Sequence, residues 1–278
     1  MKVYIIHAAS FVSRLFLKLF LIFNPFPILP VNQNYRTMLL KALIGLSVVS
    51  TFVAATTPPE GEAIVKKMYD RYHGKWQHNY TFNQTTEIYH NDTLTKKQTW
   101  YEAIEFPNKF RIDFGPADSG NAVLFVNDSS FRFKGGKLTA ARKDHDDLTF
   151  LLGGMYFFPF EEVKEKLKEQ KYDLNKFHEE TWQGKPVYVL GADKGEENVN
   201  QLWIDKANLY LVRMITFDNN RKEDARFEKQ VRLNGGWSES TTLFYVNDQL
   251  IQAEYYHDLK SNIRLDPKIF DPRPFSKR

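Results

Sequence analysis

The sequence contains no cysteine and is poor in glycine and proline, with 14 and 12 residues among 278. Without cysteine there can be no disulfides, thiolate metal sites or cysteine nucleophiles. The chain also lacks a glycine-rich phosphate loop, a G-x-S-x-G motif and an HExxH motif, and its seven histidines are scattered. We therefore expect no metal, no cofactor and no catalytic activity.

Acidic residues are absent from the N-terminal part of the chain. Residues 1–55 contain five Lys or Arg and no Asp or Glu, whereas the rest carries 33 basic residues against 34 acidic ones. The basic isoelectric point, near 8.9, therefore originates in the N-terminal part. A nucleic-acid interface needs clustered Lys and Arg to neutralise phosphates. The near-neutral remainder argues against nucleic acid as a partner.

A secretory signal peptide is predicted over residues 38–55. A short basic region ends at Lys41, the apolar run Ala42–Val53 follows, and small residues lead to a cleavage site near Ala55. The apolar run is too short to span a membrane. The signal predicts export, and the lack of cysteine after it indicates that the protein is not itself a lipoprotein.

The N-terminal segment 1–37 has two interpretations. We favour an upstream extension whose start codon is assigned too early; the alternative is a membrane anchor around Leu15–Phe26. We expect residues 56–278 to form a single exported domain.

The exported part begins with one helix and continues with strands. Apolar residues recur at helical spacing from Ile64 to Tyr72, and His73-Gly74 should end the helix. From Asn79 onward, short segments rich in aromatic and β-branched residues are separated by turn pairs such as Asn91-Asp92. The pattern predicts a mainly β fold with some helix, namely one curved antiparallel sheet of about ten to twelve strands.

One apolar segment, Leu148–Phe158, interrupts the strands and is itself interrupted by Gly153-Gly154. As a helix it is too short to cross a bilayer, so it should be buried or should cover an apolar opening. The glycine pair can be a hinge or a helix cap. A polar helix with Val163 and Leu167 facing inward should follow over Phe160–Gln170.

The stretch from Trp100 to Phe114 predicts two strands joined at Pro107. Phe110, Ile112 and Phe114 alternate with charged residues, and Trp100 and Ile104 share a face of the preceding strand. These side chains either fill an ordinary core or line a cavity.

Several motifs in order resemble the LolA-type periplasmic lipoprotein carriers. They are F-x-Q-x-T at Phe82–Thr86, the turn Pro107–Phe110 between aromatic strands, the hairpin Leu124–Phe133 and the C-terminal Phe270–Pro272. The similarity spans most of residues 60–275. It implies a LolA-like incomplete β-barrel covered by an N-terminal helix and a short apolar lid helix.

The resemblance also implies a function and a site. Such a protein is a periplasmic carrier whose apolar cavity accepts the acyl chains of lipoproteins, or a similar apolar ligand, for delivery to the outer membrane. Its partners would be the acylated ligand, an inner-membrane transporter and an outer-membrane acceptor. The lid would hinge at Gly153 and Gly154. The expected lining residues are Trp100, Ile104, Phe110, Ile112, Phe114, Leu124, Phe131, Phe133, Phe150, Leu151, Met155 and Phe157.

The chain departs from the family at one position. The family has an arginine before the turn proline that latches the lid, and Phe106 stands there in this chain. Arg111 and Arg213 are the nearest basic candidates for a substitute. Two other functions stay open: a lipid-sensing or scaffolding domain that uses the same cavity, and a hydrolase of surface glycolipids.

Overall fold

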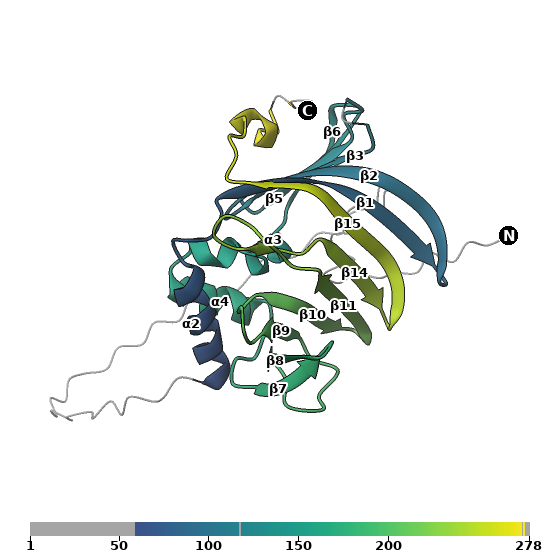
Figure 1. The fold of residues 1–278 in the computed structure, drawn as a ribbon. Helices are drawn as coiled ribbons and strands as arrows, with labels where there is room; N and C mark the ends of the chain where they lie inside the picture. The colour runs from purple at the N-terminus through teal and green to yellow at the C-terminus, as the bar shows by residue number, and fades with distance from the viewer. Residues whose placement is uncertain (1–58, 117, 274, 276–278) are drawn as a thin grey trace, which may run out of the picture.

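The computed structural model describes residues 59–116, 118–273 and 275. The predicted signal peptide and the segment before it lie outside these residues. The described chain is built on one 13-stranded antiparallel sheet in the order β6-β5-β4-β3-β2-β1-β15-β14-β11-β10-β9-β8-β7. The sheet is strongly curved (Figure 1).

The sheet joins two sequential meanders, because the first strand pairs with the last one. The N-terminal strands are β1 (Asn79–His90), β2 (Thr93–Glu105), β3 (Lys109–Phe114), β4 (Ala122–Val126), β5 (Ser129–Lys134) and β6 (Lys137–Lys143). The C-terminal strands are β7 (Phe177–Trp182), β8 (Lys185–Leu190), β9 (Gln201–Asp205), β10 (Leu211–Asp218), β11 (Arg221–Glu228), β14 (Thr241–Val246) and β15 (Gln249–Ser261). A separate ribbon pairs β12 (Val231–Arg232) with β13 (Trp237–Ser238).

The hairpin turns explain much of this topology. Asn91-Asp92 and Asn127-Asp128 have positive φ at both residues, and so do Asn219-Asn220 and Asn247-Asp248. Two consecutive positive φ values define the type I′ turn, whose twist matches that of the strands it joins. Four hairpins are therefore encoded by short Asn/Asp pairs.

The sheet does not close into a barrel, because β6 and β7 lie at opposite ends of the strand order. Between them the chain forms α3 (Asp147–Leu151), the 3₁₀ helix η2 (Gly154–Phe157) and α4 (Phe160–Glu169). These helices gather with α2 (Glu60–Tyr72) at one end of the curved sheet (Figure 1). In the described part of the chain, no helix combines the length and the apolar character that crossing a bilayer requires.

The predicted mainly β architecture and its helices are confirmed, with three differences. The polar strand β7 was not predicted, so the sheet exceeds the expected number of strands. The apolar segment is not one helix but α3 and η2, separated by Gly153. A second 3₁₀ segment, η3 (Pro267–Phe270), lies on β3, against the face of the sheet that is turned away from the helices.

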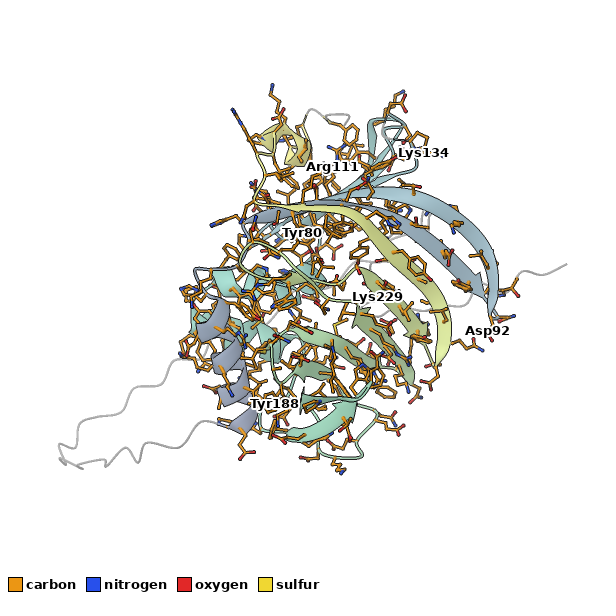
Figure 2. The ribbon with its side chains drawn as sticks, in the orientation of Figure 1. Tyr80, Asp92, Arg111, Lys134, Tyr188 and Lys229 are labelled. Carbon is orange, nitrogen blue, oxygen red and sulfur yellow. The ribbon has the colours of Figure 1, made fainter. Side chains whose placement is uncertain are left out.

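The two faces of the sheet bury different kinds of side chain. In Figure 2, Tyr80 and Arg111 lie on opposite sides of the sheet, Tyr80 toward the helices and Arg111 toward η3. We call the first the concave face and the second the convex face. The arginine is fully buried and forms two hydrogen bonds of 2.7 and 2.6 Å with Asp113, and it donates a third to the Ile269 carbonyl oxygen.

Candidate ligand-binding site

The concave face carries an aromatic surface assembled by strand register. Trp100 lies opposite Phe114 and Ile104 opposite Phe110 across the β2–β3 pair. The Trp100 and Phe114 rings meet edge to face at 5.0 Å. Since side chains alternate along a strand, Ile112 shares this face. The five residues predicted from this stretch are therefore brought together.

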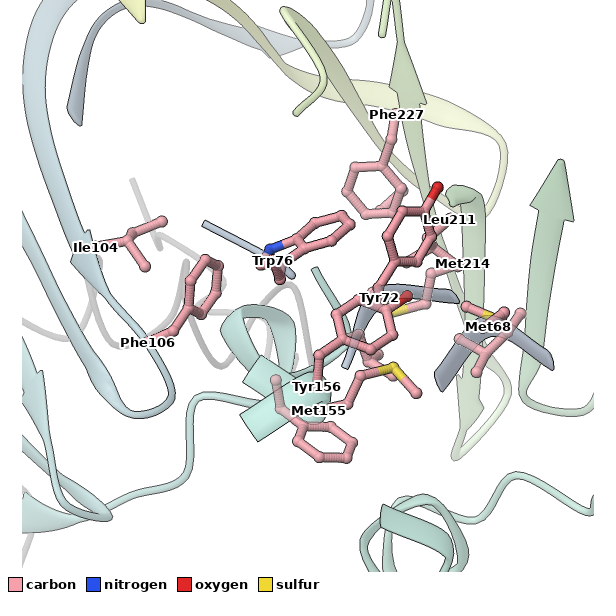
Figure 3. Packing of buried hydrophobic residues seen from close by; sticks show 14 of the residues in the cluster. Met68, Tyr72, Trp76, Ile104, Phe106, Met155, Tyr156, Leu211, Met214 and Phe227 are labelled. Atoms are coloured by element: carbon pink, nitrogen blue, oxygen red, sulfur yellow. The ribbon is translucent and has the colours of Figure 1, made fainter. Parts of the chain in front are cut away.

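Helical residues cover this aromatic surface. Tyr72 of α2, Trp76 just after it and Tyr156 of η2 pack with ring centroids 4.8–5.3 Å apart. Figure 3 shows these three rings between Phe106 on one side and the sheet residues Leu211 and Phe227 on the other. Nine of the twelve predicted lining residues lie in this one cluster, either buried or partly buried at its margin: Trp100, Ile104, Phe110, Ile112, Phe114, Phe150, Leu151, Met155 and Phe157.

The other three predicted lining residues lie elsewhere. Leu124 and Phe133 belong to a second cluster with Ala122, and Phe131 packs at its edge. Because Phe110 pairs with Phe125 and Ile112 with Val123, β4 directs its odd-numbered residues to the concave face. Leu124 therefore points to the convex face, where Phe133 stacks on Phe275 at 4.3 Å.

The predicted glycine pair is tightly packed. Gly153 has φ +152° and ψ −25°, and a Cβ there would lie closer than 3.0 Å to the Trp76 indole and the Phe106 ring. A Cβ at Gly154 would lie 2.9 Å from the Pro107 carbonyl oxygen. Only glycine fits the space and the backbone angle at position 153. The join between α3 and η2 thus rests directly on the turn between β2 and β3.

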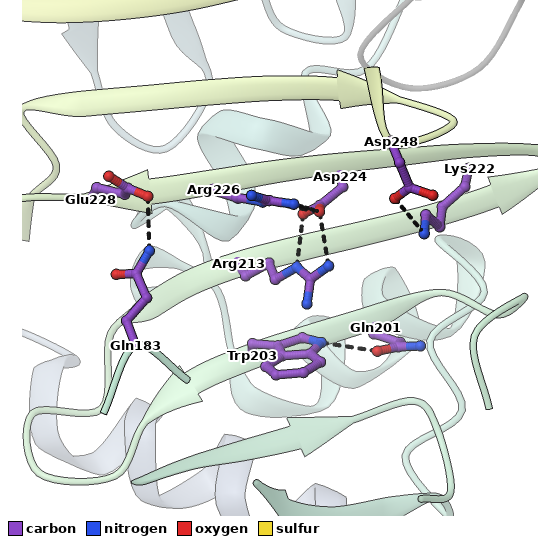
Figure 4. A network of polar contacts seen from close by, with 9 residues as sticks. All are labelled: Gln183, Gln201, Trp203, Arg213, Lys222, Asp224, Arg226, Glu228 and Asp248. Carbon is purple, nitrogen blue, oxygen red and sulfur yellow. Dashed lines mark hydrogen bonds and ion pairs between the residues drawn. The ribbon is translucent and has the colours of Figure 1, made fainter. Parts of the chain in front are cut away.

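Phe106 makes apolar contacts at the position where the family has its latch arginine. Its ring stacks on Phe157 of η2 at 5.6 Å and lies 5.9 Å from the Tyr80 ring. Neither candidate substitute reaches η2. Arg111 is buried on the convex face, and Arg213 stacks on Trp182 and Trp203 at 4.4 and 4.7 Å while pairing with Asp224 (Figure 4). The contact with η2 at this position is therefore between two aromatic rings.

A cleft of about 290 Å³ lies beside the covering helices. Its apolar wall includes Phe125, Phe150 and Phe158, and its polar wall includes Asp146 and Asp218. The cleft lies between β4 and the turn at Pro107 on one side and β10 on the other. Pockets for small ligands usually measure about 300–1,000 Å³, so this volume is at their lower limit.

A group of polar side chains is buried on the same concave face, and sequence reasoning missed it. Gln84 and Thr86 follow Tyr80 and Phe82 at strand spacing, and each is wholly buried. Gln84 lies opposite Tyr256 of β15, and Thr86 lies opposite Glu254. The sequence pattern that could have revealed them is that polar residues continue, at every second position, the series of buried aromatic residues on the same strand.

Burial changes the acidity of this region. It raises the pKa of Glu254 to about 7, against hydrogen bonds from Tyr256 and Gln252 that act in the other direction. Burial likewise raises the pKa of Glu239 to about 7. Two carboxyl groups near the aromatic surface therefore change their charge close to neutral pH.

A metal site is not apparent among the described residues, where no three His, Asp or Glu side chains are grouped to hold an ion. The His145 ring lies 3.0 Å from Asp128, and both side chains are largely exposed. The pair is therefore a contact at the surface.

The curved open sheet with helices over its concave face forms an open LolA-like half-barrel. No protein-family profile matches the chain, and no curated protein is significantly similar to it. Its likeness is to solved structures. A DUF1329 family protein from Desulfovibrio piger has a TM-score of 0.54 and 15% identity, over 78% of this chain and 98% of that one. At such identity the likeness concerns the fold alone.

A second structure of the same fold is described as an outer membrane lipoprotein-sorting protein domain, from Vibrio parahaemolyticus. It has a TM-score of 0.53 and 15% identity, over 77% of this chain and 97% of that one. A LolA superfamily protein from Nitrosomonas europaea follows at a TM-score of 0.49 and 15% identity, over 76% and 97% of the two chains. The first two structures support the predicted fold.

Proposed function

We propose that the protein is a periplasmic carrier that binds the acyl chains of lipoproteins, or a similar apolar ligand, on the concave aromatic surface and delivers them to the outer membrane. It catalyses no reaction. The observation that carries this proposal is the opening of the sheet between β6 and β7, where short apolar helices, and not strands, cover an aromatic face. These helices are held by side-chain packing and by hydrogen bonds from His73 and Tyr69 to the carbonyl oxygens of Tyr156 and Phe158. None of these contacts is part of the strand ladder, so the helices can move away without breaking the sheet.

The physical basis is the hydrophobic effect. Burying a chain of about 16 carbons gains on the order of 0.8 kcal/mol per methylene, or roughly 12 kcal/mol in total. The ligand must displace α3 and η2, whose packing against Trp76 and Phe106 closes the surface. Binding therefore exchanges one apolar contact for another, and release requires only an acceptor that offers a better apolar surface.

The segment α3–η2 is the moving part in this proposal. In the chain it follows β6 and precedes α4, and its regular structure is limited to five residues in α3 and four in η2. Helices this short have little stability of their own. Their position depends on the aromatic packing that a ligand chain would replace.

Lipid extraction followed by mass spectrometry tests the binding step. The purified protein should yield acyl lipids or acylated peptides, and acyl chains should displace an apolar fluorescent probe from it. Absence of both would overturn the proposal. Transfer of a labelled lipoprotein out of inner-membrane vesicles separates the carrier from the lipid-sensing alternative, since a sensor binds lipid without transferring it.

A further inference from the structure

The polar side chains on the concave face form rows across neighbouring strands. Trp100, Gln84 and Tyr256 lie opposite one another on β2, β1 and β15. In the next row Thr86 lies opposite Glu254, which lies opposite Thr242 of β14. Gln252 belongs to a third row, opposite Ile88 of β1 and Phe244 of β14. The rows continue the aromatic surface toward the far ends of the long strands.

Most polar atoms in these rows bond to one another. Gln84 donates to the Thr86 hydroxyl at 2.9 Å, Tyr256 donates to Glu254 at 3.0 Å, and Gln252 also donates to Glu254. The Tyr256 hydroxyl lies 3.1 Å from that of Thr242, and its ring stacks on Phe82 at 4.2 Å. The rows are therefore fixed in place by side-chain contacts.

Three atoms in these rows lack a partner. The side-chain oxygens of Gln84 and Gln252 and the indole nitrogen of Trp100 are buried, and none forms a hydrogen bond in the structure. Gln84 and Gln252 are 0% and 2% exposed, and Trp100 is 3% exposed. Buried polar groups are nearly always hydrogen-bonded in folded proteins, so unpartnered ones need an explanation.

We propose that these rows bind the polar head of the amphiphile, with the oxygens of Gln84, Gln252 and Glu254 accepting hydrogen bonds from its hydroxyl or amide groups and Trp100 donating to its carbonyl oxygen. The inference rests on the proposed function, since the acyl chain would lie on the adjacent aromatic surface. Acceptors outnumber donors among the unpartnered atoms, so the head must carry O–H or N–H groups. Amide-linked acyl chains and glycerol esters have this chemistry.

An anionic head fits poorly here. Glu254 is joined by Glu239 and Glu102, whose charges also act on Tyr256. At pH 8, where the carboxyl groups of Glu254 and Glu239 are ionised, a phosphate placed against them would meet acceptors and negative charge, where it needs donors and positive charge. The site should therefore select neutral hydroxyl-bearing or amide-bearing amphiphiles over anionic ones of equal chain length.

The test compares three amphiphiles with the same lauroyl-length chain: monolauroylglycerol, methyl laurate and dodecyl phosphate. Their affinities for the full chain are measured by displacement of an apolar fluorescent probe. We expect monolauroylglycerol to bind about tenfold more tightly than methyl laurate, from one or two additional hydrogen bonds. Dodecyl phosphate should bind most weakly.

Variants assign this selectivity to the rows. Gln84→Met and Gln252→Met should bring monolauroylglycerol and methyl laurate to nearly equal affinity. The control Gln249→Met, at an exposed position of β15, should keep the difference. Glu254→Gln should improve binding of dodecyl phosphate. If the methionine variants fail to fold, the isosteric Glu254→Gln variant and the order of affinities in the wild type decide whether the head site exists.

The outcomes distinguish the head site from the acyl-chain carrier. Equal affinities for the three amphiphiles in the wild type would overturn the head site and leave the acyl-chain carrier intact. An equal loss for all three in Gln84→Met and Gln252→Met would also overturn it. Failure of every amphiphile to bind would remove the proposed function together with this inference.

Discussion

Replacement of Gly153 by alanine tests whether α3 and η2 form a displaceable lid. The added methyl group would lie closer than 3.0 Å to both Trp76 and Phe106, at a backbone φ of +152°. Crowding and backbone strain each cost about 1–3 kcal/mol, so we expect the closed conformation to lose about 2–6 kcal/mol. Gly184→Ala is the control, because φ is +76° there and no atom lies within 4 Å. It should lose only about 1 kcal/mol.

If α3 and η2 form a lid, Gly153→Ala should also change ligand binding. If the strain acts only on the closed conformation, the open one becomes more populated. An excess of about 2 kcal/mol over the control corresponds to a rise of up to about 30-fold in the open population, and in the apparent affinity for an apolar probe.

The assays are urea denaturation followed by circular dichroism, and titration with an apolar fluorescent probe. Gly153→Ala should be less stable than Gly184→Ala and should bind the probe more tightly. If it is destabilised and its probe affinity does not rise, the segment belongs to a closed core. If neither quantity changes, the packing described around Gly153 is wrong.

Two other predictions concern buried charges. Asp113→Asn leaves the buried Arg111 guanidinium without its carboxylate partner and should lower the free energy of unfolding by about 3–5 kcal/mol. The acyl affinity of the folded variant should stay the same, because the pair lies on the convex face. A changed affinity under conditions in which the variant is folded would contradict this. The pKa of Glu239 is raised from 4.5 to about 7 by burial, so between these values the folded state holds more protons than the unfolded state, and the free energy of unfolding should fall by up to about 3 kcal/mol as the pH rises from 4.5 to 7. Denaturation at pH 5 and pH 8 measures that loss of stability, and Glu239→Gln should reduce it. A wild-type stability that does not depend on pH would refute the prediction.

The fold was predictable where local signals were strong. Asn-Asp pairs mark three of the hairpin turns, and strict alternation marks β3. Strand β7 escaped because its sequence, FHEETW, is polar and its burial is slight at an edge of the sheet. An edge strand of this kind has neither an apolar run nor a clear two-residue period.

The site was predictable only in part, because the register of β4 and β5 is a tertiary property. The sequence AVLFV is apolar throughout and does not reveal that Leu124 faces away from Phe110. Phe131 and Phe133 face the convex side because C-terminal residues, including Phe275, cover them there. A contact across more than a hundred residues leaves no mark in the local pattern.

The polar rows were missed for a different reason. Gln84 and Thr86 are polar, and polar residues in a strand are usually exposed. Only pairing with β2 and β15 shows that Gln84 lies between Trp100 and Tyr256 and that Thr86 lies beside Glu254. Their burial follows from the curvature of the sheet, which no short segment encodes.

Quenching of tryptophan fluorescence by a brominated acyl chain shows whether a ligand chain lies on the concave aromatic surface. Trp76 and Trp100 lie in the concave cluster, whereas Trp182 and Trp203 stack with Arg213 on the convex face. In a variant with phenylalanine at positions 182, 203 and 237, the account predicts saturable quenching of the two remaining indoles by brominated monoacylglycerol. Quenching that is absent, or that occurs only when the convex tryptophans are present, would contradict it.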